Sequence, residues 1–202
     1  MSTAATIPRW EWRCFAPSLT ISPKTLLIPA DAARHESDEV YILDLTGRIS
    51  DNVKIRDEVL DVKRLLKTDA DGLELWEPIL KARFPLGRKD VAAVFAAWMP
   101  PASELTRDSY ALAELVEDIF ATRPALRLVR VHKSRRGFTF SGCLAEVAQI
   151  RAETVSMQTL SLEHEDPKRL LAALCSLGLN AHANTNYILG LKRALGLEHT
   201  AG

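Results

Sequence analysis

The sequence predicts an α+β fold built on antiparallel strands, and two observations support this prediction. From Leu126 to Glu163, apolar and polar residues alternate over most of the stretch, which is typical of strands with one buried face. Turn-like breaks at 133–137, 141–142 and 151–153 are those expected of hairpins between antiparallel neighbours. Helical spacing replaces the alternation in two pairs of segments, each of which follows a strand-rich block.

Composition limits what the protein can bind. The 202 residues are 47% hydrophobic, which suffices for the core of a single domain over 1–202. The 26 basic and 26 acidic residues balance, so no overall field attracts nucleic acid or an anionic membrane, and any anion site must be local. No apolar run reaches the ~18–20 residues that span a bilayer. No apolar signal core begins the chain. We therefore expect a cytoplasmic protein with no nucleic-acid or membrane partner.

The cysteines give no sign of a zinc site. Cys14, Cys143 and Cys175 are far apart and have no CxxC spacing, so we interpret them as buried free thiols.

The first half of the chain reads as strands. Alternation predicts strands over 9–15 and 39–45, with a proline-rich loop over 18–37 between them. A hairpin follows over 53–66, and its turn falls at Asp57-Glu58. Residues 73–84 form a further strand, which Pro78 confines to an edge or a bulge because proline donates no ladder hydrogen bond.

Four helices are predicted. The first covers 88–99, with Trp98 on its apolar face, and ends at Pro100-Pro101. Ser103 caps a second helix with an apolar face from Tyr110 to Phe120. Asp166-Pro167 begins the third helix, which Gly178 closes. Asn184 caps the last one, and its apolar positions are Tyr187, Ile188, Leu191 and Leu195.

Each strand has one apolar and one charged face, which leaves two architectures open. In an open sheet the charged face lies in water and the apolar face packs on helices. In a closed barrel the charged face lines a lumen, which is costly unless anions or carboxylates neutralise the basic residues. Periodicity alone favours the open sheet.

Three runs shift this preference, because they resemble the CYTH, or triphosphate tunnel metalloenzyme, family. DNVKIRDEVLDVKRL is similar to its basic pair and the lysine of the next strand. VHKSRRGFTFSGCLAEVAQIRAETVSMQTLSLEHEDPKRLLAAL resembles its K-x-R, acidic and E-x-E strands and the helix that follows them. NTNYILGLKRAL resembles its closing helix. The resemblance implies a closed or nearly closed antiparallel β-barrel of about eight strands, a tunnel with helices packed outside. Known members bind triphosphate-bearing ligands with a glutamate-held divalent metal, and include triphosphatases and class IV-type adenylate cyclases.

The resemblance also implies site residues. Phosphate-binding side chains would be Lys54, Arg56, Lys63, Arg130, Lys133, Arg135 and Arg13. Of the family's first-strand E-x-E-x-K, Glu11 keeps the first acid, while Arg13 and Phe15 replace the rest. Glu146 matches the later acidic strand, but Thr159 and Ser161 replace the late glutamates. The late lysine falls near Asn186.

A metal site for Mg²⁺ or Mn²⁺ is therefore reduced to Glu11 and Glu146. Both have a simpler interpretation as ion-pair partners, of the flanking arginines and of a cross-strand arginine respectively. Since divalent cations prefer several hard oxygen ligands, the metal half of the site is eroded while the cationic half is kept.

We therefore predict a protein that binds a phosphorylated small molecule or polyphosphate in a basic tunnel, with weak or lost metal-dependent phosphohydrolase activity. One alternative is an active metal-dependent triphosphatase or adenylate cyclase-type enzyme. Its missing carboxylates would come from Glu39, Asp44, Asp61, Glu74 or Glu77. Another is a non-ligand-binding interaction protein with an open sheet. The sequence leaves homodimer formation open.

Overall fold

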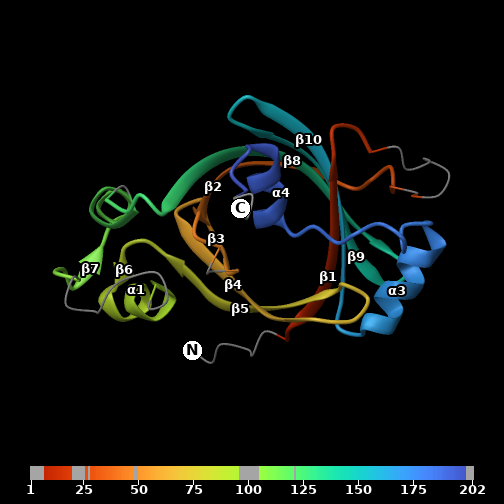
Figure 1. Ribbon diagram of the computed structural model, residues 1–202, viewed down its shortest axis with the longest axis horizontal. Coiled ribbons are helices and arrows are strands. Elements are labelled where there is room, and N and C mark those ends of the chain that lie inside the picture. The colour runs from red at the N-terminus through yellow and green to blue at the C-terminus, as the bar shows by residue number, and fades with distance from the viewer. Residues whose placement is uncertain are drawn as a thin grey trace.

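The strands close into an antiparallel barrel in the order β1-β10-β9-β8-β2-β3-β4-β5 (Figure 1). The computed structural model describes residues 7–19, 26, 28–47, 50–95, 105–120 and 122–198. Barrel closure confirms the predicted fold class, and the open sheet is wrong. The charged faces of the strands therefore line a lumen. The barrel strands are β1 (Arg9–Ala16), β2 (Arg34–Asp44), β3 (Asn52–Arg56), β4 (Val59–Thr68), β5 (Glu74–Arg83), β8 (Leu126–Phe140), β9 (Cys143–Ala152) and β10 (Val155–His164).

Two stretches predicted as turn or loop are strand. Residues 133–137 lie inside the 15-residue β8, and β2 begins at Arg34 within the predicted loop. The reason is that these residues pair on the barrel: Arg136 lies opposite Val147 of β9 on one side and Arg34 of β2 on the other. Pairing satisfies the backbone groups of a stretch whose polar side chains suggested a turn.

The helices partly follow the predictions. They are α1 (Arg88–Phe95), α2 (Leu112–Glu114), η2 (Leu115–Phe120), α3 (Pro167–Ser176) and α4 (Tyr187–Ala194), with a small sheet of β6 (Leu86–Gly87) and β7 (Ser109–Tyr110). The side chain of Asp166 caps α3 as predicted. Asn186, not Asn184, caps α4. Tyr110 belongs to β7 and not to a helix. The predicted helix-end residues Trp98, Pro100, Pro101 and Ser103 lie outside the described part of the chain.

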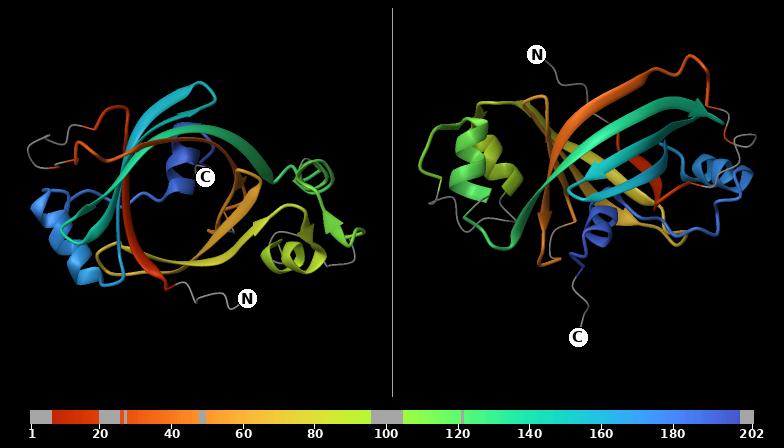
Figure 2. Two further views of the ribbon diagram at one scale, coloured as in Figure 1. Left: turned by 180° about the vertical axis from the view of Figure 1, so that it is seen from behind. Right: turned by 90° about the horizontal axis from the view of Figure 1, so that it is seen from above.

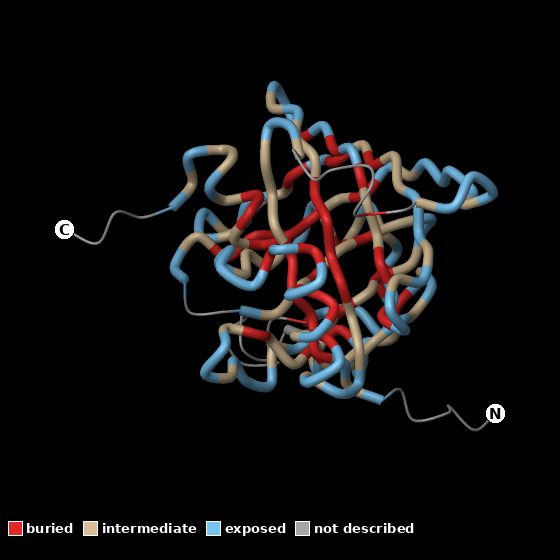
Figure 3. The backbone as a smooth tube through the Cα atoms, turned by 90° about the vertical axis from the view of Figure 1, so that its right-hand side faces the viewer, coloured by how far each residue is buried: buried red, intermediate tan, exposed pale blue. Residues whose placement is uncertain are grey.

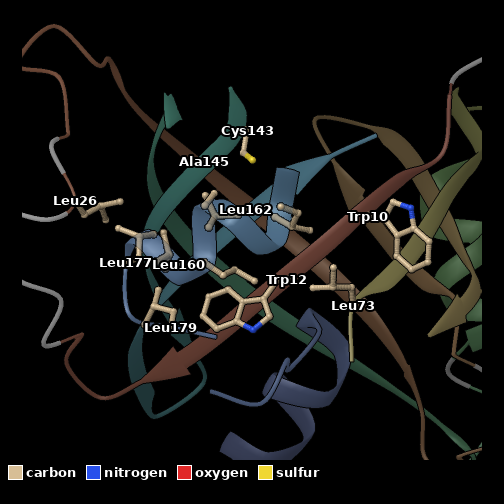
Figure 4. Close-up of a cluster of buried hydrophobic side chains, with 13 residues drawn as sticks. Trp10, Trp12, Leu26, Leu73, Cys143, Ala145, Leu160, Leu162, Leu177 and Leu179 are labelled. Carbon is tan, nitrogen blue, oxygen red and sulfur yellow. The ribbon is translucent and has the colours of Figure 1, made fainter. Parts of the chain in front are cut away.

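Two apolar clusters lie outside the barrel, on opposite sides (Figure 2). One joins α1 and η2 to the outward faces of β3 and β4. In the other, α3 packs against Trp12, Leu160 and Leu162 of β1 and β10 (Figure 4). Buried residues concentrate in the interior of the molecule, and exposed residues gather in the outer loops (Figure 3).

α4 differs from the other helices because its apolar face packs on lumen-facing residues at one end of the barrel (Figures 1 and 2). Its Tyr187 ring stacks on Tyr41 of β2, with ring centroids 4.6 Å apart, and makes an edge contact of 5.4 Å with Phe15 of β1. Ile188 and Leu191 join the same cluster with the inward residues of β8 and β9. The predicted helices outside the barrel are α1, η2 and α3, whereas α4 closes one end of the lumen and fills that part with apolar side chains.

In the part of the chain that the structure describes, no helix is long and apolar enough to cross a membrane.

The contact between α4 and β1 leaves no space for a side chain at Gly190. A Cβ atom there would overlap the ring of Phe15. Gly190→Ala should therefore lower the free energy of unfolding by about 1–3 kcal/mol, measured by urea denaturation. Gly137→Ala is the control, because its nearest neighbouring atom would be 3.9 Å away. Equal stability of the two variants would show that α4 does not dock against Phe15.

Candidate functional site

The polar part of the lumen holds cations and carboxylates from many strands. The cations are Arg13, Lys54, Arg56, Lys63, Lys133 and Arg135. The carboxylates paired with them are Glu11, Glu39, Asp61, Glu146 and Glu163. Alternation places them together, because residues two apart on a strand share a face. The lumen therefore contains neutralised charge rather than bare positive charge.

An inner layer of charge is deeply buried and tightly paired. Arg13 Nε donates to Glu11 Oε1 at 2.9 Å, and Arg13 Nη1 lies 3.6 Å from Glu146 Oε1. Lys133 Nζ lies 2.7 Å from Glu146 Oε1. The side chains of Arg13 and Lys133 are only 7% and 5% exposed. Both cations also lie 5.1 Å from the centre of the Tyr187 ring, which adds a cation–π contact from α4.

An outer layer is more open and more loosely paired. Lys54 Nζ lies 3.9 Å from Glu39 and 3.8 Å from Asp61, and Arg56 lies 3.4 Å from Glu39. Lys63 Nζ lies 3.9 Å from Glu11 and 3.8 Å from Glu163. The side chains of the three cations are between 17% and 30% exposed. Most of these distances exceed hydrogen-bond length, so the donors keep capacity for another acceptor.

The electrostatics of the inner layer centre on Glu146. Burial acts to raise its pKa, but Lys133, Arg13 and Arg135 together hold that pKa well below its ordinary range. Burial lowers the pKa of Lys133 to about 8, and nearby Arg13 acts in the same direction. The two shifts are compatible because several cations share the single charge of Glu146, which only partly compensates the burial of Lys133.

The structure gathers most of the predicted phosphate-binding residues, but not Arg130. Lys133 and Arg135 of β8 face the lumen and contact Glu146. Arg130 is exposed on the outer face, whereas Val129 and Val131 on either side of it are buried. A shift of one residue along a strand moves a side chain to the opposite face, so Arg130 has the wrong parity for the lumen.

The carboxylates proposed to replace lost metal ligands fall in different places. Glu39 and Asp61 lie in the lumen among the cations. Glu74 binds the side chains of Asn186 and Trp76 near α4. Asp44 instead accepts hydrogen bonds from Thr46 at the end of β2. Glu77 lies opposite the exposed Arg64.

Sequence reasoning missed Glu163 and the lumen roles of the tyrosines. Glu163 shares a face with Ser161 and lies directly opposite Glu11 in the register. Because Glu163 is two residues from Ser161 on an alternating strand, the sequence could have predicted that both residues face the lumen. Tyr41 donates to buried Glu39 at 2.8 Å, and Tyr187 stacks on Tyr41. No local pattern predicts that these tyrosines lie in the lumen, because α4 meets β2 only in the folded chain.

The residues present do not fit a divalent metal. Glu11 and Glu146, predicted as ligands, are both engaged by Arg13. Among the described residues, no three carboxylate, histidine or cysteine side chains gather in a way that suits a metal ion. Mg²⁺ and Mn²⁺ need several oxygen ligands, and here those oxygens face guanidinium and ammonium groups.

Glu146→Gln tests the inner layer. It leaves buried Lys133 without its carboxylate, so the free energy of unfolding at pH 7 should fall by about 3–5 kcal/mol, measured by urea denaturation. Glu153→Gln is the control: its partner Arg127 is exposed, and such a pair contributes about 0–1 kcal/mol.

The cost of Glu146→Gln should depend on pH. Because the folded-state pKa of Glu146 is lowered, its contribution is complete above the unfolded value of about 4.3 and is lost as the pH falls towards the folded value. The gap between wild type and variant should therefore narrow below about pH 4. A gap that stays constant from pH 7 to pH 3 would contradict this account.

Comparison with known proteins bears on the fold. No family model matches the chain, and no curated protein matches it. Among solved structures, a proposed adenylate cyclase from Bacillus halodurans is 11% identical, with a TM-score of 0.50 over 91% of this chain and 97% of that one. A proposed adenylyl cyclase from Hippeastrum with a dominant triphosphatase activity is 16% identical, with a TM-score of 0.45 over 95% and 99%. A conserved hypothetical protein from Pyrococcus furiosus is 14% identical, with a TM-score of 0.47 over 91% and 98%. At the level of the fold, the first match and the closed barrel confirm the predicted resemblance: the chain has a CYTH-like closed barrel of eight antiparallel strands.

Proposed function

We propose that the protein binds a triphosphate- or polyphosphate-type anion in its lumen and that metal-dependent phosphohydrolase activity is weak or lost. The observation that carries the proposal is the outer layer of Lys54, Arg56 and Lys63. These side chains come from the adjacent strands β3 and β4, are partly exposed, and reach their carboxylates at 3.4–3.9 Å. Cations held this loosely have room for phosphate oxygens.

When the anion binds, the outer-layer cations either share their contacts between carboxylate and phosphate oxygens or exchange the carboxylate for phosphate. The guanidinium of Arg56 can present two donors to one phosphoryl group, whereas Lys54 and Lys63 act as point charges. Arg135, 32% exposed and 3.2 Å from Glu146, adds a donor from β8. The ligand competes with Glu39, Asp61 and Glu163 for these cations, so its charge must exceed that of a single carboxylate, which favours a polyanion.

The inner layer supports binding but not turnover. Phosphoryl transfer in this type of site depends on a metal to neutralise charge and to activate the attacking group. Arg13 occupies both predicted metal-binding carboxylates, Glu11 and Glu146. Two of the alternative carboxylates are also engaged: Glu39 by Tyr41, Ser37 and Arg56, and Glu74 by Asn186 and Trp76.

Thermal unfolding with sodium tripolyphosphate in EDTA tests the proposal. A ligand at 100 times its Kd adds about 2.7 kcal/mol to stability, so Tm should rise by several degrees. The double variant Lys54→Ala/Arg56→Ala should lose the shift. Arg130→Ala should keep it, because Arg130 is a barrel-strand arginine that faces away from the lumen. The shift should also shrink as NaCl is raised, since it depends on charge.

The same assay separates the other functions. A shift that appears only with Mg²⁺ or Mn²⁺ would favour the metal-dependent triphosphatase or cyclase, to be followed by a phosphate-release assay. No shift in any condition would reject anion binding and favour an interaction protein.

A further inference from the structure

Two carboxylates face each other in the polar part of the lumen. Glu11 of β1 and Glu163 of β10 are direct partners in the antiparallel register, and Glu146 lies on the neighbouring strand β9. Like charges directly opposite each other on a sheet destabilise it unless a cation lies between them. An opposed pair of this kind requires a counter-ion from elsewhere in the fold.

The counter-ion is Lys63. Its Nζ lies 3.9 Å from Glu11 Oε2 and 3.8 Å from Glu163 Oε1, so a single ammonium group bridges the two carboxylates. Lys63 belongs to β4, which is separated from β1 by β5, and its side chain therefore reaches both carboxylates across a strand that is not its own. Within the described residues, Lys63 is the cation that forms an ion pair with Glu163.

We propose that Lys63 is a tethered counter-ion that takes the position a divalent cation would occupy between Glu11 and Glu163, and so sets the metal independence of the lumen. The role of Lys63 towards the ligand rests on the proposed function and follows from the exposure of the Lys63 side chain. The Lys63 side chain is 30% exposed, so the ammonium can contact the carboxylates on one side and a phosphate oxygen on the other. An ammonium has no open coordination position and does not activate water as a metal does, which permits binding without hydrolysis.

A comparison with Lys54 shows why metal independence is assigned to Lys63. Lys54 also lies between two carboxylates, Glu39 and Asp61. Glu39, however, also accepts hydrogen bonds from Arg56, Tyr41 and Ser37, and would remain satisfied without Lys54. Removing Lys63 instead leaves Glu163 without its cation and frees Glu11 Oε2, because Arg13 holds the other oxygen, Oε1. These are two carboxylate oxygens of the kind that Mn²⁺ binds together with water.

The test is a titration with Mn²⁺ in the absence of phosphate. Electron paramagnetic resonance of the free Mn²⁺ monitors how much of the metal is bound. Wild type should show no stoichiometric site. Lys63→Met should bind one Mn²⁺ per chain, at least tenfold more tightly than wild type. Lys63→Met/Glu163→Gln is the matched control: it also lacks the lysine but has lost one of the two carboxylates, and should bind no better than wild type.

Thermal unfolding gives a second readout. Lys63→Met should unfold at a lower temperature than wild type, and Mn²⁺ should restore part of the loss in this variant but not in the double variant. If Lys63→Met does not fold, Lys63→Gln, which keeps a polar side chain, takes its place in the titration.

Three results would overturn the inference: a stoichiometric Mn²⁺ site in wild type, no gain in the folded Lys63 variant, or an equal gain in the double variant. None of them depends on tripolyphosphate. Failure of wild type to bind tripolyphosphate would reject the proposed function and leave the counter-ion role of Lys63 standing, so the two failures are distinguishable.

Discussion

The structure depends on how charge is neutralised inside a closed barrel. Closure turns the charged face of each strand inwards, where an unpaired ion costs several kcal/mol even after relaxation. Arg13 resolves this at the centre of the lumen, because it contacts both Glu11 and Glu146 while Thr159 accepts a further hydrogen bond from it. Lys133 completes the inner layer against Glu146. The inner layer is thus a structural element as much as a candidate binding surface.

α4 divides the lumen into an apolar and a polar part. Its apolar face meets the inward residues of β2, β8 and β9, and its cap residue Asn186 binds Glu74 of β5. Tyr187 lies at the boundary: its ring packs on Tyr41 and also lies 5.1 Å from Arg13 and from Lys133. The helix therefore both fills the barrel and provides one wall of the inner charge layer.

The two layers have different physical properties, and the proposed function rests on that difference. Short distances and deep burial fix Arg13 and Lys133, so exchanging their partners would leave carboxylates buried without a counter-ion. Longer distances and partial exposure leave Lys54, Arg56 and Lys63 free to take another acceptor at lower cost. Fixed cations near Glu11 and Glu146 oppose a metal, and the proposed anion site lies among the loosely held cations nearer the solvent.

Alternation and capping are local properties of the chain, so they predict most of the barrel strands, the two faces of those strands and the start of α3. It also placed Lys54, Arg56 and Lys63 on one face, since residues two apart on a strand point the same way. The resemblance supplied what periodicity did not, namely closure of the sheet.

Which charges meet depends on contacts that form only in the folded chain. The contact of Lys63 with Glu163 joins residues far apart in the sequence, and it exists because β1 pairs with both β5 and β10. Pairing between distant strands also extended β8 through a stretch that was predicted as a turn, and it formed the apolar surface on which α4 packs at one end of the barrel. Strand register and ion pairing across a lumen depend on contacts between distant segments, so a local residue pattern does not predict either of these features.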